Sequence, residues 1–91
     1  MPYIEPGARV VIDPKVEALD SAILTEGDLN YVVTRLALRF ARRKGLKYAV
    51  LNTVVGVFEC AKLEFYRRLV ACYEADKIYI NGDVPEYQEV P

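Results

Sequence analysis

The stretch that most constrains the fold is residues 46–79, which contains no proline and a single glycine, Gly56. Apolar residues recur along it at intervals of three and four, the spacing that places side chains on one face of a helix. Because each helical residue adds ~1.5 Å, a helix over this stretch would be roughly 50 Å long. We therefore predict one long helix from Leu46 to Tyr79, with a kink at Gly56 as the alternative.

This predicted helix is apolar on two sides. The larger apolar face comprises Val50, Leu51, Val54, Phe58, Ala61, Phe65, Leu69 and Cys72. The second face comprises Ala49, Gly56, Cys60, Leu63, Val70, Ala71 and Ile78. Two shorter helices cannot easily cover both faces of so long a rod. We therefore expect the second face to form an oligomer interface with another copy of the chain, through Gly56, Cys60, Leu63 and Val70.

The N-terminal segment is rich in residues that interrupt helices. Pro2, Pro6 and Gly7 lie within the first twelve residues, so we predict an extended arm over residues 1–12. The pair Asp13-Pro14 then favours a helix start, because aspartate caps free N–H groups and proline suits the first helical position. A short helix should follow from there to about Leu24.

A second helix is predicted over Leu29–Lys44, with Asp28 as its N-cap and Gly45 as the residue that ends it. Its predicted core face comprises Leu29, Val32, Val33, Leu36, Ala37 and Phe40. The short link at residues 45–47 favours an antiparallel hairpin between this helix and the long one. The fold class we predict is all-α.

The C-terminal end is predicted to leave the long helix at Asn81-Gly82, with Gly82 in the left-handed conformation. Residues 81–91 would then form an acidic tail that is extended or disordered. We assign the chain to a single domain over residues 1–91, with its helical core at residues 13–80.

Composition argues against several classes of site. The chain has no histidine and two cysteines, which excludes a typical zinc site and a disulfide framework. The carboxylate pairs Glu59/Glu64 and Glu74/Asp76 diverge on a helix. We therefore predict no enzyme activity, no metal and no cofactor. Because a 91-residue chain is only marginally stable alone, self-association is the expected reinforcement.

Charge is unevenly distributed in a chain whose net charge is −1. Six cations and no anion lie between Arg35 and Lys47, whereas five anions and one cation lie from Glu74 to the end. Arg35, Arg39 and Arg42 form a row along the second helix, with Tyr31 at one end. This row predicts a site for an anion; the alternative is a solvated face whose last cations complement the helix dipole.

A polar stripe also runs along the long helix, where Asn52, Glu59, Tyr66 and Tyr73 repeat every seven residues. Glu59 is spaced to pair with Lys62, and Glu64 with Arg67 or Arg68. The stripe is either a solvated seam of ion pairs or part of a ligand pocket. For the second case the predicted ligand-binding residues are Arg35, Arg39, Arg42, Tyr31, Lys62, Tyr66 and Arg67.

Three segments carry a resemblance to a known family: EGDLNYVVTRL, LNTVVGVFECAKLEFYRR and YEADKIYINGDV. They resemble a family of small proteins of bacteria and their phages for which no activity is established. The resemblance implies a bacterial or phage cytoplasmic origin and assigns no functional residues. In size and helical content the chain is also similar to phage proteins that oligomerise and sequester cyclic-nucleotide immune signals, an analogy of architecture alone.

Together these features predict a non-enzymatic homo-oligomeric binding protein whose ligand is an anionic, nucleotide-like small molecule. One alternative is an adaptor, inhibitor or phage regulator that binds an acidic protein. Another is a nucleic-acid accessory protein, although a general duplex binder usually carries a basic surplus. No membrane partner is expected, because no apolar run approaches ~20 residues.

Overall fold

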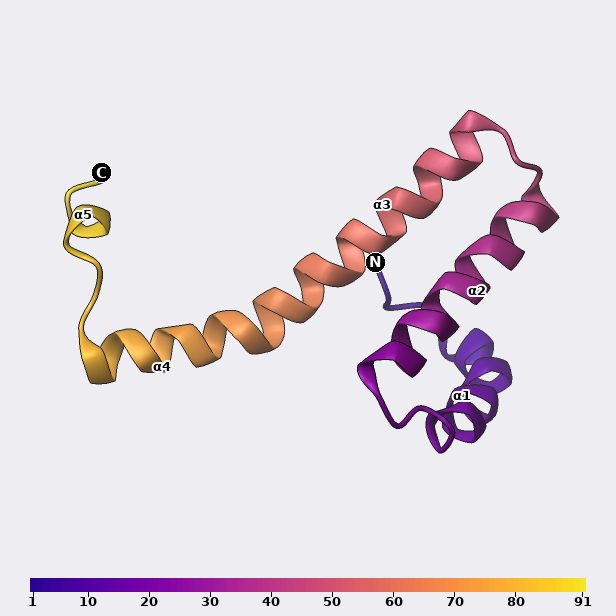
Figure 1. The fold of residues 1–91 in the computed structure, drawn as a ribbon, viewed down its shortest axis with the longest axis horizontal. Helices are drawn as coiled ribbons and strands as arrows, with labels where there is room; N and C mark the ends of the chain where they lie inside the picture. Colours follow the sequence, from indigo (N-terminus) through magenta and orange to yellow (C-terminus); the bar gives the residue numbers. More distant parts are fainter. The chain divides into compact units, whose positions relative to one another are not determined.

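The computed structural model describes residues 1–91 and contains helices without any strand (Figure 1). The elements are α1 (Pro6–Asp20), α2 (Glu26–Lys44), α3 (Tyr48–Phe65), a π-helical turn η1 (Tyr66–Val70), α4 (Ala71–Asn81) and α5 (Pro85–Gln88). The all-α prediction is confirmed. The chain divides into two compact units, residues 1–58 and 59–91, with the boundary inside α3. The single domain stays a prediction.

The N-terminal segment is helical from Pro6, so the extended arm predicted for residues 1–12 was wrong over most of its length. Glu5 precedes the helix in an extended conformation, and Pro6 occupies the first turn, where no N–H is needed. Pro14 lies inside α1 instead of starting it. Its ring costs one backbone hydrogen bond, which a 15-residue helix tolerates here. The helix ends at Asp20, earlier than the predicted Leu24.

Helix α2 begins three residues before the predicted start, because its cap is Thr25 and not Asp28. The Asp28 N–H donates to the Thr25 hydroxyl at 3.1 Å, and the Thr25 N–H donates to the Asp28 carboxylate at 3.2 Å. This reciprocal pair is a capping box with aspartate at the position that glutamate often takes. The Leu24 N–H also donates to that carboxylate, at 3.0 Å. Aspartate is therefore a capping residue, at the third helical position.

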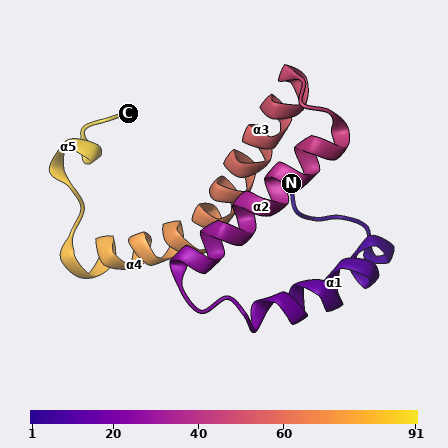
Figure 2. The ribbon, with the colours of Figure 1, turned by 45° about the vertical axis from the view of Figure 1, so that its right-hand side comes forward.

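The link between α2 and α3 follows the prediction closely. Helix α2 ends at Lys44, and Gly45 has a φ of 93°, a value that side chains rarely permit. The backbone then reverses, so α2 and the first part of α3 run in opposite directions (Figure 2). Helix α3 continues through Gly56 as regular α-helix, which excludes the kink considered there. Nothing lies within 4 Å of a Cβ placed on Gly56.

The helical run continues to Asn81, but the π-helical turn at residues 66–70 interrupts its regularity. A π-turn uses one more residue than an α-turn, so the positions after it rotate by about 100° relative to a regular helix. The prediction of the second apolar face assumed a regular α-helix. The turn therefore displaces Ala71 and Ile78, which follow it, from the face that carries Cys60 and Leu63.

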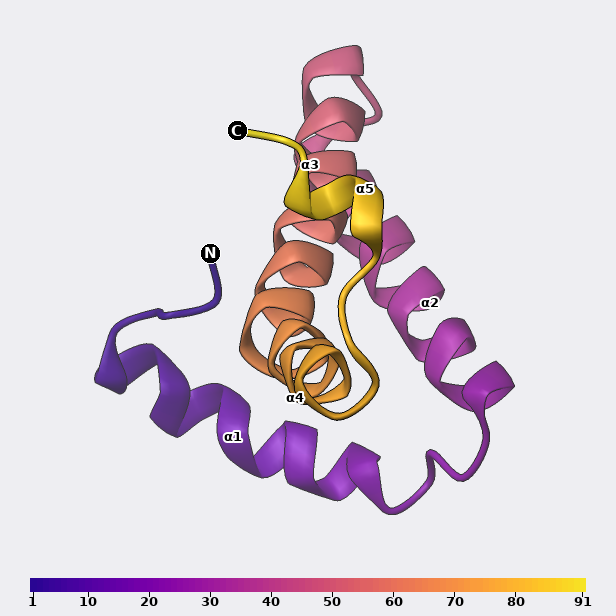
Figure 3. The ribbon, with the colours of Figure 1, turned by 90° about the vertical axis from the view of Figure 1, so that its left-hand side faces the viewer.

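The C-terminal segment departs from the axis of α4 at Gly82 (Figure 3). Gly82 has the expected positive φ of 88°, but its ψ of 156° lies outside the left-handed helical region. The predicted extended tail was wrong at Pro85–Gln88, which forms α5. Val84 is extended, as a residue before proline should be, and Pro85 then opens a helical turn.

The chain buries very little of its apolar surface. Ala41 is the buried hydrophobic residue, and no large side chain is fully buried. The predicted core face of α2 was therefore wrong as an intrachain core: Val32 and Ala37 are half-buried, whereas Leu29, Val33, Leu36 and Phe40 remain exposed. The larger face of α3 is also partly open, with Leu51 and Phe58 exposed. The helices are amphipathic, but their apolar faces remain largely exposed.

Candidate anion-binding site

The basic end of α2 carries the clearest candidate site. Arg39, Arg42 and Arg43 line one hollow of about 310 Å³. Their spacing of three and four residues places them on neighbouring turns, because α-helical side chains at these intervals are adjacent. No ion pair joins any of the three to a carboxylate. The hollow therefore presents several guanidinium donors to whatever enters it.

Arg35 and Tyr31 do not line this hollow. Their side chains form a separate cation–π pair on the same helix, with the Arg35 guanidinium carbon 5.8 Å from the centre of the Tyr31 ring. The structure therefore divides the predicted row. It keeps Arg39 and Arg42 together, adds Arg43, and leaves Arg35 stacked on an aromatic ring.

Arg43 lines the hollow but was not among the predicted ligand-binding residues. Its spacing of four from Arg39 was the signal that could have placed it in the site. The Arg43 guanidinium carbon lies 6.0 Å from the centre of the Phe40 ring, and the Lys44 ammonium lies 5.8 Å from it. Phe40 thus interacts with two cations at the end of α2, one of which, Arg43, lines the hollow.

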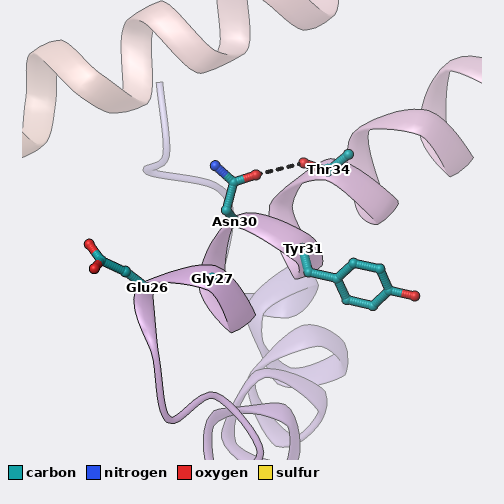
Figure 4. Close-up of a pocket in the computed structure, with 5 residues that line it drawn as sticks. All are labelled: Glu26, Gly27, Asn30, Tyr31 and Thr34. Carbon is teal, nitrogen blue, oxygen red and sulfur yellow. Dashed lines mark hydrogen bonds between the residues drawn. The ribbon is translucent and has the colours of Figure 1, made fainter.

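Tyr31 belongs to a second hollow at the start of α2, of about 600 Å³ (Figure 4). Its lining residues are Glu26, Gly27, Asn30, Tyr31 and Thr34. The Thr34 hydroxyl donates to the amide oxygen of Asn30 at 3.1 Å, and the side chains of Glu26 and Tyr31 point away from each other. Glu26 is the only charged residue among these, so this hollow does not favour an anion.

The other predicted ligand-binding residues, Lys62, Tyr66 and Arg67, belong to the unit of residues 59–91. Each contacts a carboxylate. The Lys62 ammonium lies 3.0 Å from Glu59, and Arg67 pairs with Glu64, which confirms both ion pairs expected from spacing. The Tyr66 hydroxyl donates to Glu74. These cations are therefore already compensated within their own helix, in contrast to those at the end of α2.

The Tyr66–Glu74 contact is a consequence of the π-turn. In a regular helix the residue that follows Tyr66 on the same face two turns later is seven positions on, at Tyr73. The extra residue in the turn brings Glu74 to that place instead. The hydrogen bond to the Glu74 carboxylate raises the pKa of Tyr66, so its phenol stays protonated. The seven-residue polar stripe therefore stops at the turn.

The residues predicted for the oligomer interface are accessible to different degrees. Cys60 is an exposed free thiol and Leu63 is exposed, whereas Val70 is half-buried. Cys72 is also a free, exposed thiol. That these positions form an interface stays a prediction. No three acidic or cysteine side chains converge on a point that would hold a metal ion, and none of the helices has the length and apolarity needed to cross a bilayer.

Comparison with known proteins places the chain in a family. A family model described as "Domain of unknown function (DUF6899)" matches residues 1–84, which covers all the helices except α5. Curated proteins give no match, and solved structures give none.

Proposed function

We propose, for a chain that belongs to the DUF6899 family, the function of a non-enzymatic, homo-oligomeric binding protein that holds an anionic, phosphate-bearing ligand on α2. The observation that carries the proposal is the hollow lined by Arg39, Arg42 and Arg43, in which no guanidinium is paired with a carboxylate. Arg35 and Tyr31 lie nearer the start of the same helix and are secondary candidates for ligand binding.

The chemistry of the hollow favours phosphate. Guanidinium groups present planar forks of N–H donors that match phosphate oxygens, and such charge-assisted hydrogen bonds are about twice as strong as neutral ones. Three cations close together also repel one another, so an anion between them relieves that repulsion. The volume of about 310 Å³ is at the lower end of the range for small-ligand sites. A phosphate group suits this combination, and a nucleotide would place its phosphate on the arginines.

The biological setting is part of the same proposal. The segments quoted above support an origin in bacteria or their phages, and a reduced cytoplasm suits two free, exposed thiols. The architectural likeness to phage proteins that sequester cyclic nucleotides makes cyclic nucleotides the first ligands to try. An acidic protein partner or a nucleic acid would use the same cations, so the test must separate these cases.

Calorimetry against a panel of nucleotides, cyclic nucleotides and inorganic phosphate tests the proposal. We expect at least one nucleotide to bind, and the double variant Arg39→Ala/Arg42→Ala to lose that binding. Lys15→Ala is the matched control, because it removes an exposed cation from α1 without touching the hollow. Binding that survives the double variant contradicts the assignment.

The competing partners have distinct signatures in the same assay. A single-stranded or duplex oligonucleotide that binds with an affinity falling steeply with salt would favour the nucleic-acid accessory protein instead. A panel in which no nucleotide or phosphate binds would remove the small-ligand function and favour the acidic protein partner.

A further inference from the structure

Helix α2 carries a narrow seam whose apolar side chains are exposed. Its residues, at intervals of three and four, are Glu26, Leu29, Val33, Leu36, Phe40 and Arg43. The four apolar members keep much of their surface exposed: 53% for Leu29, 40% for Val33, 58% for Leu36 and 36% for Phe40. Alternation of three and four over successive turns is the spacing of a coiled-coil seam, in which side chains of one helix fit between those of another.

The seam is complementary to itself when it is reversed. Its six positions are symmetric about the point between Thr34 and Arg35. Two copies of α2 placed antiparallel about that point would bring Leu29 against Phe40 of the second copy, and Val33 against Leu36 of the second copy. The outer positions would bring Glu26 against Arg43 of the second copy. Apolar residues therefore meet apolar residues, and the two ends meet as opposite charges.

Charge along α2 selects the antiparallel orientation. The first turn carries Glu26 and Asp28, and the last turn carries Arg42, Arg43 and Lys44. A parallel pair would place the cationic ends together at a separation of about one helix diameter, where like charges destabilise association. The antiparallel pair places each cationic end beside an acidic one and also aligns the helix dipoles favourably.

The exposed area of the chain is large enough to supply a dimer interface. The accessible surface is 8338 Å² for a mass of 10.3 kDa. A folded monomer of this mass exposes about 5,400 Å², so the surplus is about 3,000 Å² for each chain. Obligate dimers bury about 2,000–5,000 Å² in total, mostly apolar. Two chains together have a surplus of about 6,000 Å², so an interface of that size along the seam would bury part of it.

We propose that a second copy of this chain packs antiparallel on α2 along the seam from Glu26 to Arg43, with its two-fold axis between Thr34 and Arg35. This deepens the homo-oligomeric part of the proposed function by naming the interface and the partner. Arg43 would pair with Glu26 of the second copy, so in the dimer two of the three arginines of the hollow, Arg39 and Arg42, would remain uncompensated as donors for a ligand. The seam lies on a different helix from the interface predicted at Gly56, Cys60, Leu63 and Val70.

Sedimentation equilibrium of the full chain and three variants tests the interface. Leu36→Asp should weaken self-association at least tenfold, because it places a charge in the centre of the seam. Leu38→Asp is the matched control: Leu38 is 57% exposed, against 58% for Leu36, and lies on the opposite side of α2. It should leave association unchanged. Leu63→Asp should also leave it unchanged, and circular dichroism should show equal helicity in all variants.

Several outcomes overturn the seam. A monomeric wild-type chain does so, as does association that Leu36→Asp leaves intact or that Leu38→Asp weakens equally. Loss of association in Leu63→Asp alone assigns the interface to α3 instead. Calorimetry keeps the two proposals separate: a monomer that still binds nucleotide overturns the seam and leaves the ligand site standing, whereas a dimer that binds no ligand does the reverse.

The orientation has its own test. Arg43→Glu should weaken association because it faces Glu26 of the second copy, and the double variant Glu26→Lys/Arg43→Glu should restore it. Spin labels at Lys44→Cys, in a chain with Cys60→Ser and Cys72→Ser, should lie roughly 28 Å apart along the helix axis if the pair is antiparallel. Labels roughly 10 Å apart would show a parallel pair, and failure of the double variant to restore association would contradict the Glu26–Arg43 pairing.

Discussion

The second half of α2 and the π-turn segment at residues 59–74 both carry clustered cations, but they use them differently. In α2, Arg39, Arg42 and Arg43 line a hollow without any carboxylate partner. In the π-turn segment, Lys62 and Arg67 are each paired with a glutamate three residues earlier. A charged cluster therefore indicates a binding site only when its own helix does not compensate it. Spacing to the nearest carboxylate decides between the two cases.

Charge reversal should separate the two regions most strongly. Arg39→Glu/Arg42→Glu should weaken binding of a phosphate-bearing ligand by at least about a hundredfold, because each charge-assisted hydrogen bond contributes ~1.5–3 kcal/mol. Lys62→Ala/Arg67→Ala should change the affinity by less than about threefold, since these cations are already paired. Calorimetry measures both. Equal losses in the two variants would show that the regions act as one site.

The helix starts also differ. Helix α2 begins with a capping box, whereas α4, which follows the π-turn, has no side-chain cap. Thr25→Ala should destabilise the chain by ~1 kcal/mol, as loss of an N-cap hydroxyl does. Thr25→Ser should retain most of that stability, because serine keeps the oxygen that accepts from the Asp28 N–H. Urea denaturation followed by circular dichroism measures the difference. No difference between the alanine and serine variants would mean that the cap adds nothing to stability.

The capping box should make α2 sensitive to acid. Hydrogen bonds from the backbone N–H groups of Leu24 and Thr25 lower the pKa of Asp28 below its ordinary value. A depressed pKa in the folded chain contributes stability above the unfolded value, and that contribution is lost as the pH falls through the folded value. The midpoint of thermal unfolding should therefore fall between pH 7 and pH 2, and it should fall less in Asp28→Asn. An unchanged acid profile in Asp28→Asn would contradict this role.

The smallest effect is expected at the π-turn. The carboxylate of Glu74 raises the pKa of Tyr66, so Tyr66 should ionise at higher pH than a tyrosine without such a partner. Glu74→Gln should return its titration toward the ordinary range, with little change in stability because the pair is exposed. Ultraviolet titration of the phenols, with Tyr66→Phe to identify the signal, measures the shift. A Tyr66 titration unaffected by Glu74→Gln would show that the contact is not maintained in solution.

Local sequence rules accounted for the fold class, the end of α2 at Gly45, and the two ion pairs on α3 and the π-turn segment. They placed the starts of α1 and α2 incorrectly, because aspartate and proline can each occupy more than one position near the start of a helix. Asp28 caps α2, but as the third residue of a capping box opened by Thr25. Pro6 and Pro14 were interpreted as an interruption and a start, whereas α1 accepts one in its first turn and one inside it.

The candidate site was predictable in its residue type but not in its extent. Arginines at helical spacing indicated Arg39 and Arg42 correctly as neighbours. The stacking of Arg35 on Tyr31 and the inclusion of Arg43 depended on side-chain positions, which spacing alone does not give. The prediction also included Lys62, Tyr66 and Arg67, because side chains of these types can donate to phosphate. In the structure each contacts a glutamate instead.

The sequence by itself determined the all-α class, the helices that follow Gly27 and Gly45, and the apolar faces on them, because these follow from spacing and composition within a few residues. It did not determine that residues 6–12 and 85–88 are helical. Only the three-dimensional structure decided two further points. The π-turn at residues 66–70 changes which residues share a face beyond it, and this shift has no clear signature in spacing. The burial of Ala41 and the exposure of Leu29, Leu36 and Phe40 were the other point, because burial depends on contacts between segments and not on any one of them.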